Sequence, residues 1–430
     1  MHSRAQPISP SDELMQTMDR IYRSRMTTTS GGNLSIRDED GNIWVTPSGI
    51  DKGRLTRESM VCVRRDGSHE GLHAPSSELP FHLAIYSARS DLNAIVHTHS
   101  RGLQAFSIVG KVPDTRICRE AYELCGPGGF ANYALPGSEA LGREIGRVFA
   151  EGHTCVILEN HAVVVGGRTM REAFERLEMF EFTAMAILRA NGLGKLQLLS
   201  SIQHCSLNPP QAAFQEFDYS EWSDAEREAR VLLVEFIHRG YEQKLLTANS
   251  GALSMRLSKT SFLTTPHHFD RSHCAPADLV FIADGSRERG KLPNPMIPHH
   301  LAIFDRHSEI GAVVSSSPVN TMALSITDAA CDSNIIPESF VLLRSVQRLP
   351  FDAQDARGDQ LADHISLRTP VAILQNGGAV VVGTSLLDAF GRLEVLEATV
   401  ETIIDGNRLG HVSPIEARHL RELCDALSIE

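Results

Sequence analysis

The sequence predicts an α/β protein in which one fold occurs twice. Short apolar, strand-like runs alternate with amphipathic helical segments along the chain. In addition, short sequence motifs of the first half occur again in the second half in the same order. At 430 residues, the chain is long enough for two or three domains of ordinary size.

The elements of the first half can be assigned in order. A helix opens at Ser9-Pro10 with an acidic first turn and runs to about Arg25. A turn at Gly31-Gly32-Asn33 follows. Strands are then expected over residues 34–37, 42–46, 60–64, 93–97, 155–159 and 162–165. Helices are expected over 78–90, with Ser77 as the N-cap, and over 169–191.

The best candidate for a linker is the segment 206–222. It contains Pro209 and Pro210 and few periodic apolar positions. A new amphipathic helix is expected from about Ser223 to Arg239. We therefore predict a first domain over residues 1–205, a linker over 206–222 and a second domain over 223–430.

The repeat is carried by collinear matches at a nearly constant offset. Thr46-Pro47 returns as Thr265-Pro266, an offset of 219, and Ala173-Phe174 returns as Ala389-Phe390, an offset of 216. His82-Leu83-Ala84-Ile85-Tyr86 also returns, as His300-Leu301-Ala302-Ile303-Phe304. Chance similarity of apolar strands does not account for several matches that keep the same order and a nearly constant offset.

Composition limits the classes of partner and the compartment. Hydrophobic residues make up 42% and charged residues 22%, which is typical of a packed globular protein. The net charge of −12 argues against general binding to nucleic acid or to anionic membranes. The eight cysteines form no Cys-x-x-Cys pair. Residues 1–10 contain no apolar signal core, and no apolar run reaches the roughly eighteen residues needed to cross a membrane. We expect a cytoplasmic protein.

His97 and His99 alternate at the end of an expected strand, so both side chains lie on one face. Two imidazoles so placed can converge on one divalent ion, for which zinc is the default. A His-x-His pair alone is a weak motif. His161 alone would more often be structural, and Glu78 in a first helical turn is normally a partner of the helix dipole.

Taken together and in this order, the motifs resemble those of the class II aldolase/adducin family. The resemblance covers roughly residues 12–194 and, in decayed form, residues 223–410. It rests on Gly31-Gly32-Asn33-Leu34-Ser35, Thr46-Pro47-Ser48-Gly49, Pro75-Ser76-Ser77-Glu78, His97-Thr98-His99 and Asn160-His161-Ala162. It implies two tandem three-layer αβα domains, each with a mainly antiparallel central sheet.

The resemblance also implies a catalytic metal site. The divalent ion, most often zinc, is held by His97, His99 and His161, and Glu78 acts as the acid/base residue. Manganese, iron and cobalt also suit imidazole ligands. The implied activity is that of a metal-dependent lyase that cleaves a carbon–carbon bond through a metal-stabilised enediolate. A small anionic, sugar-phosphate-like compound is the expected substrate.

The phosphate of such substrates is held in this family by backbone-rich loops. The positions that match here are Gly32, Asn33, Ser48, Gly49, Ser76 and Ser77. Small residues let backbone N–H groups approach an anion, and a helix N-terminus adds a favourable field. Most loops of Gly and Ser are ordinary turns, but their coincidence with the metal motif favours an anion site for phosphate or carboxylate.

One family feature is missing from its usual place. The aldolases use a tyrosine from a neighbouring subunit as proton donor, and here that place holds Ile117 and Cys118. Tyr122 is the nearest replacement, with Glu120 beside it and Tyr133 as a further candidate. A metal-dependent decarboxylase, dehydratase or epimerase on the same scaffold therefore stays open. So does an adducin-like interaction module without catalysis.

The second copy lacks the chemistry of the first. His97 and His99 become Ser315 and Ser317, and His161 becomes Gly377. Met296 stands in place of Glu78 and Ala252 in place of Asn33. We read this copy as non-catalytic. Since the family commonly forms fourfold rings, two tandem chains are expected to form a pseudo-fourfold ring. Residues that it could donate to a neighbouring site are His267, His268, Arg271, His299 and Arg344.

Overall fold

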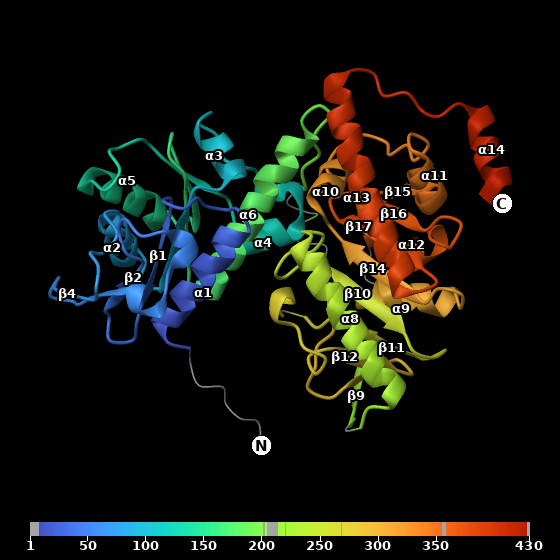
Figure 1. The fold of residues 1–430 in the computed structure, drawn as a ribbon, viewed down its shortest axis with the longest axis horizontal. Coiled ribbons are helices and arrows are strands. Elements are labelled where there is room, and N and C mark those ends of the chain that lie inside the picture. The colour runs from blue at the N-terminus through green and yellow to red at the C-terminus, as the bar shows by residue number, and fades with distance from the viewer. Residues whose placement is uncertain are drawn as a thin grey trace. The chain divides into compact units, whose positions relative to one another are not determined.

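The computed structural model describes residues 8–200, 203, 214–219, 221–267, 269–354 and 358–427. They form two compact units (Figure 1). Unit 1 comprises the chain up to residue 185 without residues 117–119, and unit 2 comprises residues 117–119 and the chain from residue 186. The predicted domain boundary and linker stay predictions, because much of the segment 206–222 lies outside the described residues.

Unit 1 is built on an eight-stranded sheet with the order β4-β3-β2-β1-β5-β8-β7-β6. Its strands are β1 (Asn33–Arg37), β2 (Ile43–Val45), β3 (Val61–Val63), β4 (His69–Glu70), β5 (Ala94–Thr98), β6 (Gly129–Ala131), β7 (Cys155–Leu158) and β8 (Val163–Gly167). Its helices are α1 (Pro10–Arg23), α2 (Leu79–Ala88), α3 (Arg101–Ser107), α4 (Arg119–Cys125), α5 (Glu139–Ala150) and α6 (Met170–Ala190).

The first helix shows how the sequence pattern determines an element. The Ser9 hydroxyl caps α1 by accepting a hydrogen bond from the Asp12 backbone N–H. Leu14, Met18 and Ile21 follow at helical spacing and are fully buried. The second predicted helix begins differently from expectation. Glu78, and not Ser77, occupies the N-cap of α2, because the Ser76 hydroxyl already turns the chain by accepting from the Glu78 N–H.

The core of unit 1 lies between the sheet and the pair α2 and α5. Phe81 and Ile85 of α2 and Ile145 and Phe149 of α5 pack on Ile95 of β5 within one buried cluster. On the other side, α1 contacts β1 and β2, and α3 contacts β7 and β8. The sheet therefore carries helices on both faces, as the αβα prediction requires.

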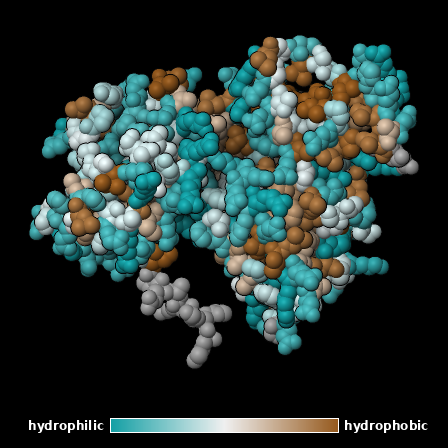
Figure 2. All heavy atoms as spheres, viewed as in Figure 1, coloured by the Kyte–Doolittle hydropathy of each residue, from teal (hydrophilic) through white to brown (hydrophobic). Residues whose placement is uncertain are grey.

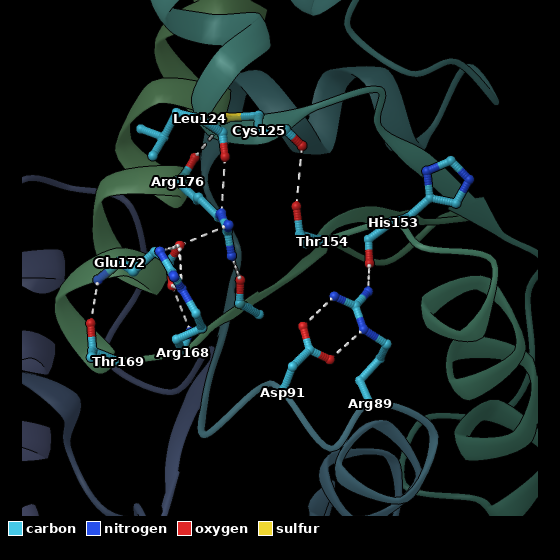
Figure 3. A network of polar contacts seen from close by, with 11 residues as sticks. Arg89, Asp91, Leu124, Cys125, His153, Thr154, Arg168, Thr169, Glu172 and Arg176 are labelled. Atoms are coloured by element: carbon cyan, nitrogen blue, oxygen red, sulfur yellow. Dashed lines mark hydrogen bonds and ion pairs between the residues drawn. The ribbon is translucent and has the colours of Figure 1, made fainter.

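Arginine side chains tie the helices of unit 1 to backbone carbonyls (Figure 3). From α6, Arg176 donates to Leu124 O of α4 at 2.9 Å and to Gly166 O of β8 at 2.6 Å. Arg89, at the end of α2, pairs with Asp91 and donates to His153 O at 3.2 Å. These contacts fix the ends of α2 and α4 within the unit.

Unit 2 repeats this architecture with a nine-stranded sheet of order β15-β16-β17-β14-β10-β11-β12-β13-β9. Its strands are β9 (Gln215–Phe217), β10 (Ala252–Arg256), β11 (Ser261–Thr264), β12 (Val280–Ala283), β13 (Ser286–Glu288), β14 (Ala312–Ser316), β15 (Val346–Leu349), β16 (Val371–Leu374) and β17 (Gly378–Gly383). Its helices are α8 (Asp224–Glu242), α9 (Ile297–Arg306), α10 (Val319–Ser325), α11 (Pro337–Leu343), α12 (Asp359–His364), α13 (Leu386–Leu409) and α14 (Ala417–Leu427).

Read from the β15 end, the first eight strands of this order match those of unit 1 read from β6. The additional strand is β9, which pairs in parallel with β13 and lies within the segment expected as a linker. The pairs β6–β7 and β15–β16 are also parallel. The sheets are therefore mixed, although most pairs are antiparallel, as predicted for the α/β fold.

The surface matches the composition. On the face drawn in Figure 2, hydrophilic side chains cover most of unit 1, and hydrophobic ones form small groups among them. Among the helices of the described residues, none is long and apolar enough to cross a bilayer.

Candidate functional site

The His-x-His pair lies where strand β5 ends, in the middle of the sheet of unit 1. His97 pairs with Asn33 of β1 on one side and with Val164 of β8 on the other. It is fully buried, and its Nδ1 lies 2.9 Å from Val163 O, so the Nδ1–H donates to that carbonyl. The Nε2 lone pair of His97 is therefore free to act as a ligand atom.

The third histidine reaches the same place from the β7–β8 hairpin. Asn160 holds the left-handed conformation, with φ of 51°, at the turn before His161. Ser107 of α3 fixes the turn: its hydroxyl donates to Leu158 O at 2.7 Å and accepts from the His161 N–H at 2.9 Å. A helix on one side of the sheet thus determines where the third imidazole stands.

The three imidazoles form one cluster. One nitrogen from each of His97, His99 and His161 lies within 4.8 Å of the others. The His97 and His99 Nε2 atoms are only 3.2 Å apart, and the ring centroids are separated by 5.0 to 5.2 Å. Gly31 and Gly32 make room for this cluster: a Cβ at Gly32, where φ is 75°, would lie 2.5 Å from His97 O.

Glu78 lies against the cluster. Its carboxylate is 3.2 Å from His97 Nε2 and 3.5 Å from His161 Nε2. The Asn33 amide donates to Glu78 Oε2 at 2.7 Å. Burial by itself would raise the pKa of the Glu78 carboxyl, but the imidazoles of His97 and His161 and the Asn33 amide beside it hold the pKa well below its ordinary value. Glu78 is therefore ionised.

The charges of the cluster fit a cation. Burial lowers the pKa of His99 and of His161 to about 4. Both imidazoles are therefore neutral at pH 7, which is the form that binds metal. Two buried atoms beside them, His161 Nδ1 and Glu78 Oε1, have no hydrogen-bond partner among the described residues. The donor set of three imidazoles and one carboxylate suits a divalent ion.

The three loops with the predicted anion-binding residues are joined to one another. The Thr46 hydroxyl accepts from the Leu34 N–H at 3.1 Å, and the Ser48 N–H donates to Ala74 O at 3.0 Å. Asn33 and Ser76 are buried, whereas Ser48, Gly49 and Ser77 are exposed. The loop 31–33, the loop 46–49 and the loop 74–78 therefore meet next to Glu78, with polar groups open to solvent.

The predicted proton donor is not part of this cluster. Tyr122 lies on α4 and is 37% exposed, and Tyr133 is 58% exposed beyond β6. The contacts that join Glu78 to the three histidines do not include either tyrosine. The role of Tyr122 stays a prediction.

Sequence reasoning missed a buried polar chain behind Glu78. His82 of α2 is fully buried between Ser35 Oγ, 2.7 Å from its Nδ1, and Asn33 Oδ1, 2.5 Å from its Nε2. Tyr86 OH lies 2.8 Å from the same Ser35 Oγ. The sequence signal for this position is the return of His82 as His300. The second copy keeps this histidine although it lacks the proposed metal ligands, which indicates a role for the histidine in the scaffold.

All hydrogen bonds of this buried polar chain point in one direction, toward Glu78. The carboxylate of Glu78 only accepts, so the Asn33 NH₂ faces it and Asn33 Oδ1 faces His82. His82 must then donate from Nε2 and accept at Nδ1 from the Ser35 hydroxyl. The Ser35 oxygen is left to accept from Tyr86. The chain orients Asn33 and through it the Glu78 carboxylate.

Among the described residues of unit 2, no such cluster of possible metal ligands occurs at the equivalent place. His300 is buried, with Nδ1 2.7 Å from Ser254 Oγ and Nε2 2.7 Å from Ser315 Oγ. Among the residues of the second copy that were predicted to contribute to a neighbouring site, Arg271 and His299 are buried, and His268 lies outside the described residues. Whether His267, His299, Arg271 or Arg344 serves another site stays a prediction.

Known proteins with related sequences match a little less than half of this chain. The L-fuculose phosphate aldolase of Methanococcus maripaludis is 32% identical over 182 residues, which is 42% of this chain and 97% of that protein. The 3-oxo-tetronate 4-phosphate decarboxylase of Haemophilus influenzae is 33% identical over 185 residues, 42% of this chain and 88% of its own. A solved structure of a putative aldolase/epimerase/decarboxylase from Klebsiella pneumoniae is 28% identical, covers 46% of this chain and 97% of its own, and has a TM-score of 0.43.

The family model described as class II aldolase and adducin N-terminal domain matches the chain twice, over residues 12–188 and 231–404. Together these segments make up more than half of the chain, and each lies on one of the two repeats. The chain therefore belongs to the class II aldolase and adducin family and carries its domain in tandem.

Proposed function

We propose that unit 1 is a metal-dependent carbon–carbon lyase for a small phosphorylated hydroxyketone, and that unit 2 has no catalytic role. The observation that carries the proposal is the cluster of His97, His99 and His161 beside the ionised Glu78. Three imidazoles, which are uncharged ligands, would hold a divalent metal and leave most of its positive charge uncompensated. A metal bound there stabilises the negative charge that develops on a substrate oxygen.

Glu78 is the proposed acid/base group. Breaking a bond next to a ketone leaves an electron pair on the adjacent carbon, and that carbon must afterwards take up a proton. An ionised carboxylate can accept a proton from a substrate hydroxyl and return it to this carbon. Asn33 donates to Glu78 Oε2, so the other oxygen, Oε1, is the one available for proton transfer.

Two reactions on this scaffold fit the same groups. Aldol cleavage is supported by the likeness to L-fuculose phosphate aldolase. Decarboxylation is supported by the likeness to 3-oxo-tetronate 4-phosphate decarboxylase and by the absence of a tyrosine at positions 117 and 118. Both release an electron pair beside a carbonyl, so both need the same charge stabilisation. We favour a lyase of this kind over dehydration, epimerisation or an adducin-like scaffold.

The test joins metal content with product identity. The full chain is loaded with zinc, manganese or cobalt and incubated with L-fuculose phosphate and with 3-oxo-tetronate 4-phosphate. Release of an aldehyde identifies aldol cleavage, and release of carbon dioxide identifies decarboxylation. A protein that holds metal but cleaves no carbon–carbon bond in either compound or in related ketose phosphates contradicts the lyase proposal.

The matched variants are His97→Ala and Ser315→Ala, at equivalent positions of β5 and β14. We expect His97→Ala to lower bound metal from about one ion per chain to near zero and to abolish turnover. Ser315→Ala should leave both unchanged, because that position offers no metal ligand. Equal metal content in the two variants would place the ion elsewhere. The pseudo-fourfold ring of two chains, zinc as the native metal and the cytoplasmic location stay predictions.

A further inference from the structure

One buried cation lies among the three loops of the anion site. Lys52 belongs to the short 3₁₀ helix η1 (Lys52–Arg54), and its side chain is only 4% exposed. Its backbone N–H donates to Thr29 O at 2.9 Å, and its ammonium group donates to Pro47 O at 2.9 Å. We propose that the Lys52 ammonium binds the phosphate group of the substrate, and this inference rests on the proposed function.

The position of Lys52 follows from these two bonds. Thr29 precedes the Gly31-Gly32-Asn33 turn, and Pro47 directly precedes Ser48 and Gly49. Pro47 also forms a β-bridge with Pro75, which leads into Ser76 and Ser77. The ammonium group therefore lies against the loop 46–49, beside its bridge to the loop 74–78, and the backbone of Lys52 is bonded to the segment that leads into the loop 31–33. At Gly49, where φ is 69°, an added Cβ would meet no atom within 4 Å, so the space beside Gly49 is open.

The ammonium group has bonding capacity left for a ligand. A lysine ammonium has three N–H donors, and among the described residues its hydrogen-bond partner is the Pro47 carbonyl alone. Burial lowers the pKa of Lys52, and the negative charge of Glu78 raises it. Keeping a charge buried with one neutral acceptor is unfavourable. A phosphate would supply both the missing acceptors and the opposite charge.

Unit 2 holds a cation at the same position without this capacity. Arg271 opens η4 (Arg271–His273) after Asp270, as Lys52 opens η1 after Asp51, and it is 2% exposed. Its guanidinium donates to Gly251 O through Nε at 3.2 Å and Nη2 at 2.9 Å, and to Phe269 O at 2.6 Å. Gly251 is the equivalent of Gly32. The unit without the metal ligands therefore binds its cation to two loop carbonyls through three donor contacts, whereas the Lys52 ammonium has one such contact, to Pro47 O.

Binding of inorganic phosphate and of methyl phosphate by the metal-loaded full chain tests this role. Lys52→Met removes the charge and keeps most of the side-chain volume. We expect it to weaken the binding of both probes at least tenfold in calorimetric titration and to raise KM for a phosphorylated substrate more than it lowers kcat. Acetate is the comparison probe, and its binding should be weaker and insensitive to the substitution.

Arg54→Met is the matched control, because Arg54 lies in the same 3₁₀ helix with its side chain 87% exposed. It should leave phosphate binding unchanged, which excludes a general effect of net charge. If Lys52→Met does not fold, Lys52→Gln keeps a donor for the Pro47 carbonyl and removes only the charge.

Unchanged phosphate affinity in either Lys52 variant overturns the inference, and so does a wild-type chain that binds acetate as tightly as phosphate or binds no phosphate. The proposed function fails differently, through loss of metal or of carbon–carbon cleavage. A chain that cleaves its substrate with the same KM in wild type and Lys52→Met would retain the lyase and lose the role of Lys52.

Discussion

The two units keep the same buried histidine but surround it with hydrogen bonds of opposite direction. In unit 1, His82 donates from Nε2 toward Asn33 and Glu78 and accepts at Nδ1. In unit 2, the Thr264 hydroxyl donates to Leu253 O, so Ser254 donates to Thr264 and its oxygen accepts from His300 Nδ1. His300 Nε2 then accepts from Ser315. The two histidines are therefore opposite tautomers.

This difference shows that the scaffold and the chemistry are separable. The sheet order, the buried histidine and the left-handed asparagine turn (φ of 51° at Asn160 and 58° at Asn376) occur in both units. The space for the third imidazole occurs only in unit 1. A Cβ at Gly377 would overlap Gln354 Oε1, and Gln354 is held in place by its bond to Gln375 O. In unit 2, Gln354 therefore occupies the space next to Gly377, and the residues equivalent to the three histidines of unit 1 are Ser315, Ser317 and Gly377.

The largest difference between the two units is expected when the buried histidine that both of them keep is replaced. We expect His82→Leu to lower kcat by about ten- to a hundredfold, as for loss of a residue that orients a metal-site group. Bound metal should be retained, because His82 supplies no proposed ligand. Turnover and metal content are measured on the same samples. His300→Leu is the control and should leave kcat unchanged.

Equal losses of kcat in His82→Leu and His300→Leu would mean that the histidine stabilises the fold in both units and does not position Glu78. The pH profile of kcat adds a readout that a purely structural role does not change. With its orientation lost, Glu78 should shift the acidic limb of this profile, whereas His300→Leu should not.

A smaller effect is expected where the units agree. Glu181 accepts the Gly102 and Leu103 N–H groups at the start of α3, at 2.8 and 3.0 Å. Glu397 does the same for Asn320 and Thr321 at the start of α10. Since glutamine offers only one acceptor oxygen, each Glu→Gln change should lower the free energy of unfolding by about 1–3 kcal/mol.

Urea unfolding of Glu181→Gln and Glu397→Gln measures these two losses. Only Glu181→Gln should also weaken metal binding, because α3 follows directly after His99. A large loss in one variant and none in the other would contradict the view that the scaffold is equivalent in the two units.

The smallest effect concerns pH. Burial lowers the pKa of both His82 and His300 to about 3. Between their ordinary value of about 6.5 and this value, the unfolded chain binds a proton that the folded chain does not, so stability falls as the pH falls. We expect each histidine to contribute a loss of about 1 kcal/mol between pH 6.5 and 5.5. Unfolding of the metal-free chain across this range measures the slope.

His82→Leu and His300→Leu should each reduce that slope by a similar amount. A slope that responds to only one of them would show that the two buried sites differ in more than the direction of their hydrogen bonds. A slope that responds to neither would mean that other groups cause the acid sensitivity.

Much of the fold was predictable because local patterns determine it. The capped helix at Ser9-Pro10 and the buried strand before His97 agree with α1 and β5 within two residues. Because the second half of the sequence repeats the first, the fold predicted for unit 1 also predicted that of unit 2. By contrast, β9 within the predicted linker 206–222 was not predicted as a strand, because three residues that complete a sheet edge carry no periodic pattern of their own.

The site was predictable where single residues carry the chemistry. The structure brings His97, His99, His161 and Glu78 together, which spacing alone did not require. Tyr122 was predicted from its nearness in sequence, and its side chain is exposed on α4. Lys52 and His82 were missed because their importance depends on burial and on partners distant in sequence, such as Asn33.

The strand β9 has a practical consequence for dividing this protein. Glu216 pairs with Arg287, Asp218 pairs with Arg289, and the Arg289 N–H donates to Phe217 O at 3.0 Å. A fragment that starts at Ser223, where the first long helix of unit 2 is capped, would leave unpaired those backbone groups of β13 that bond to β9. Such bare sheet edges promote association between copies. Separate expression of unit 2 should therefore begin before Gln215.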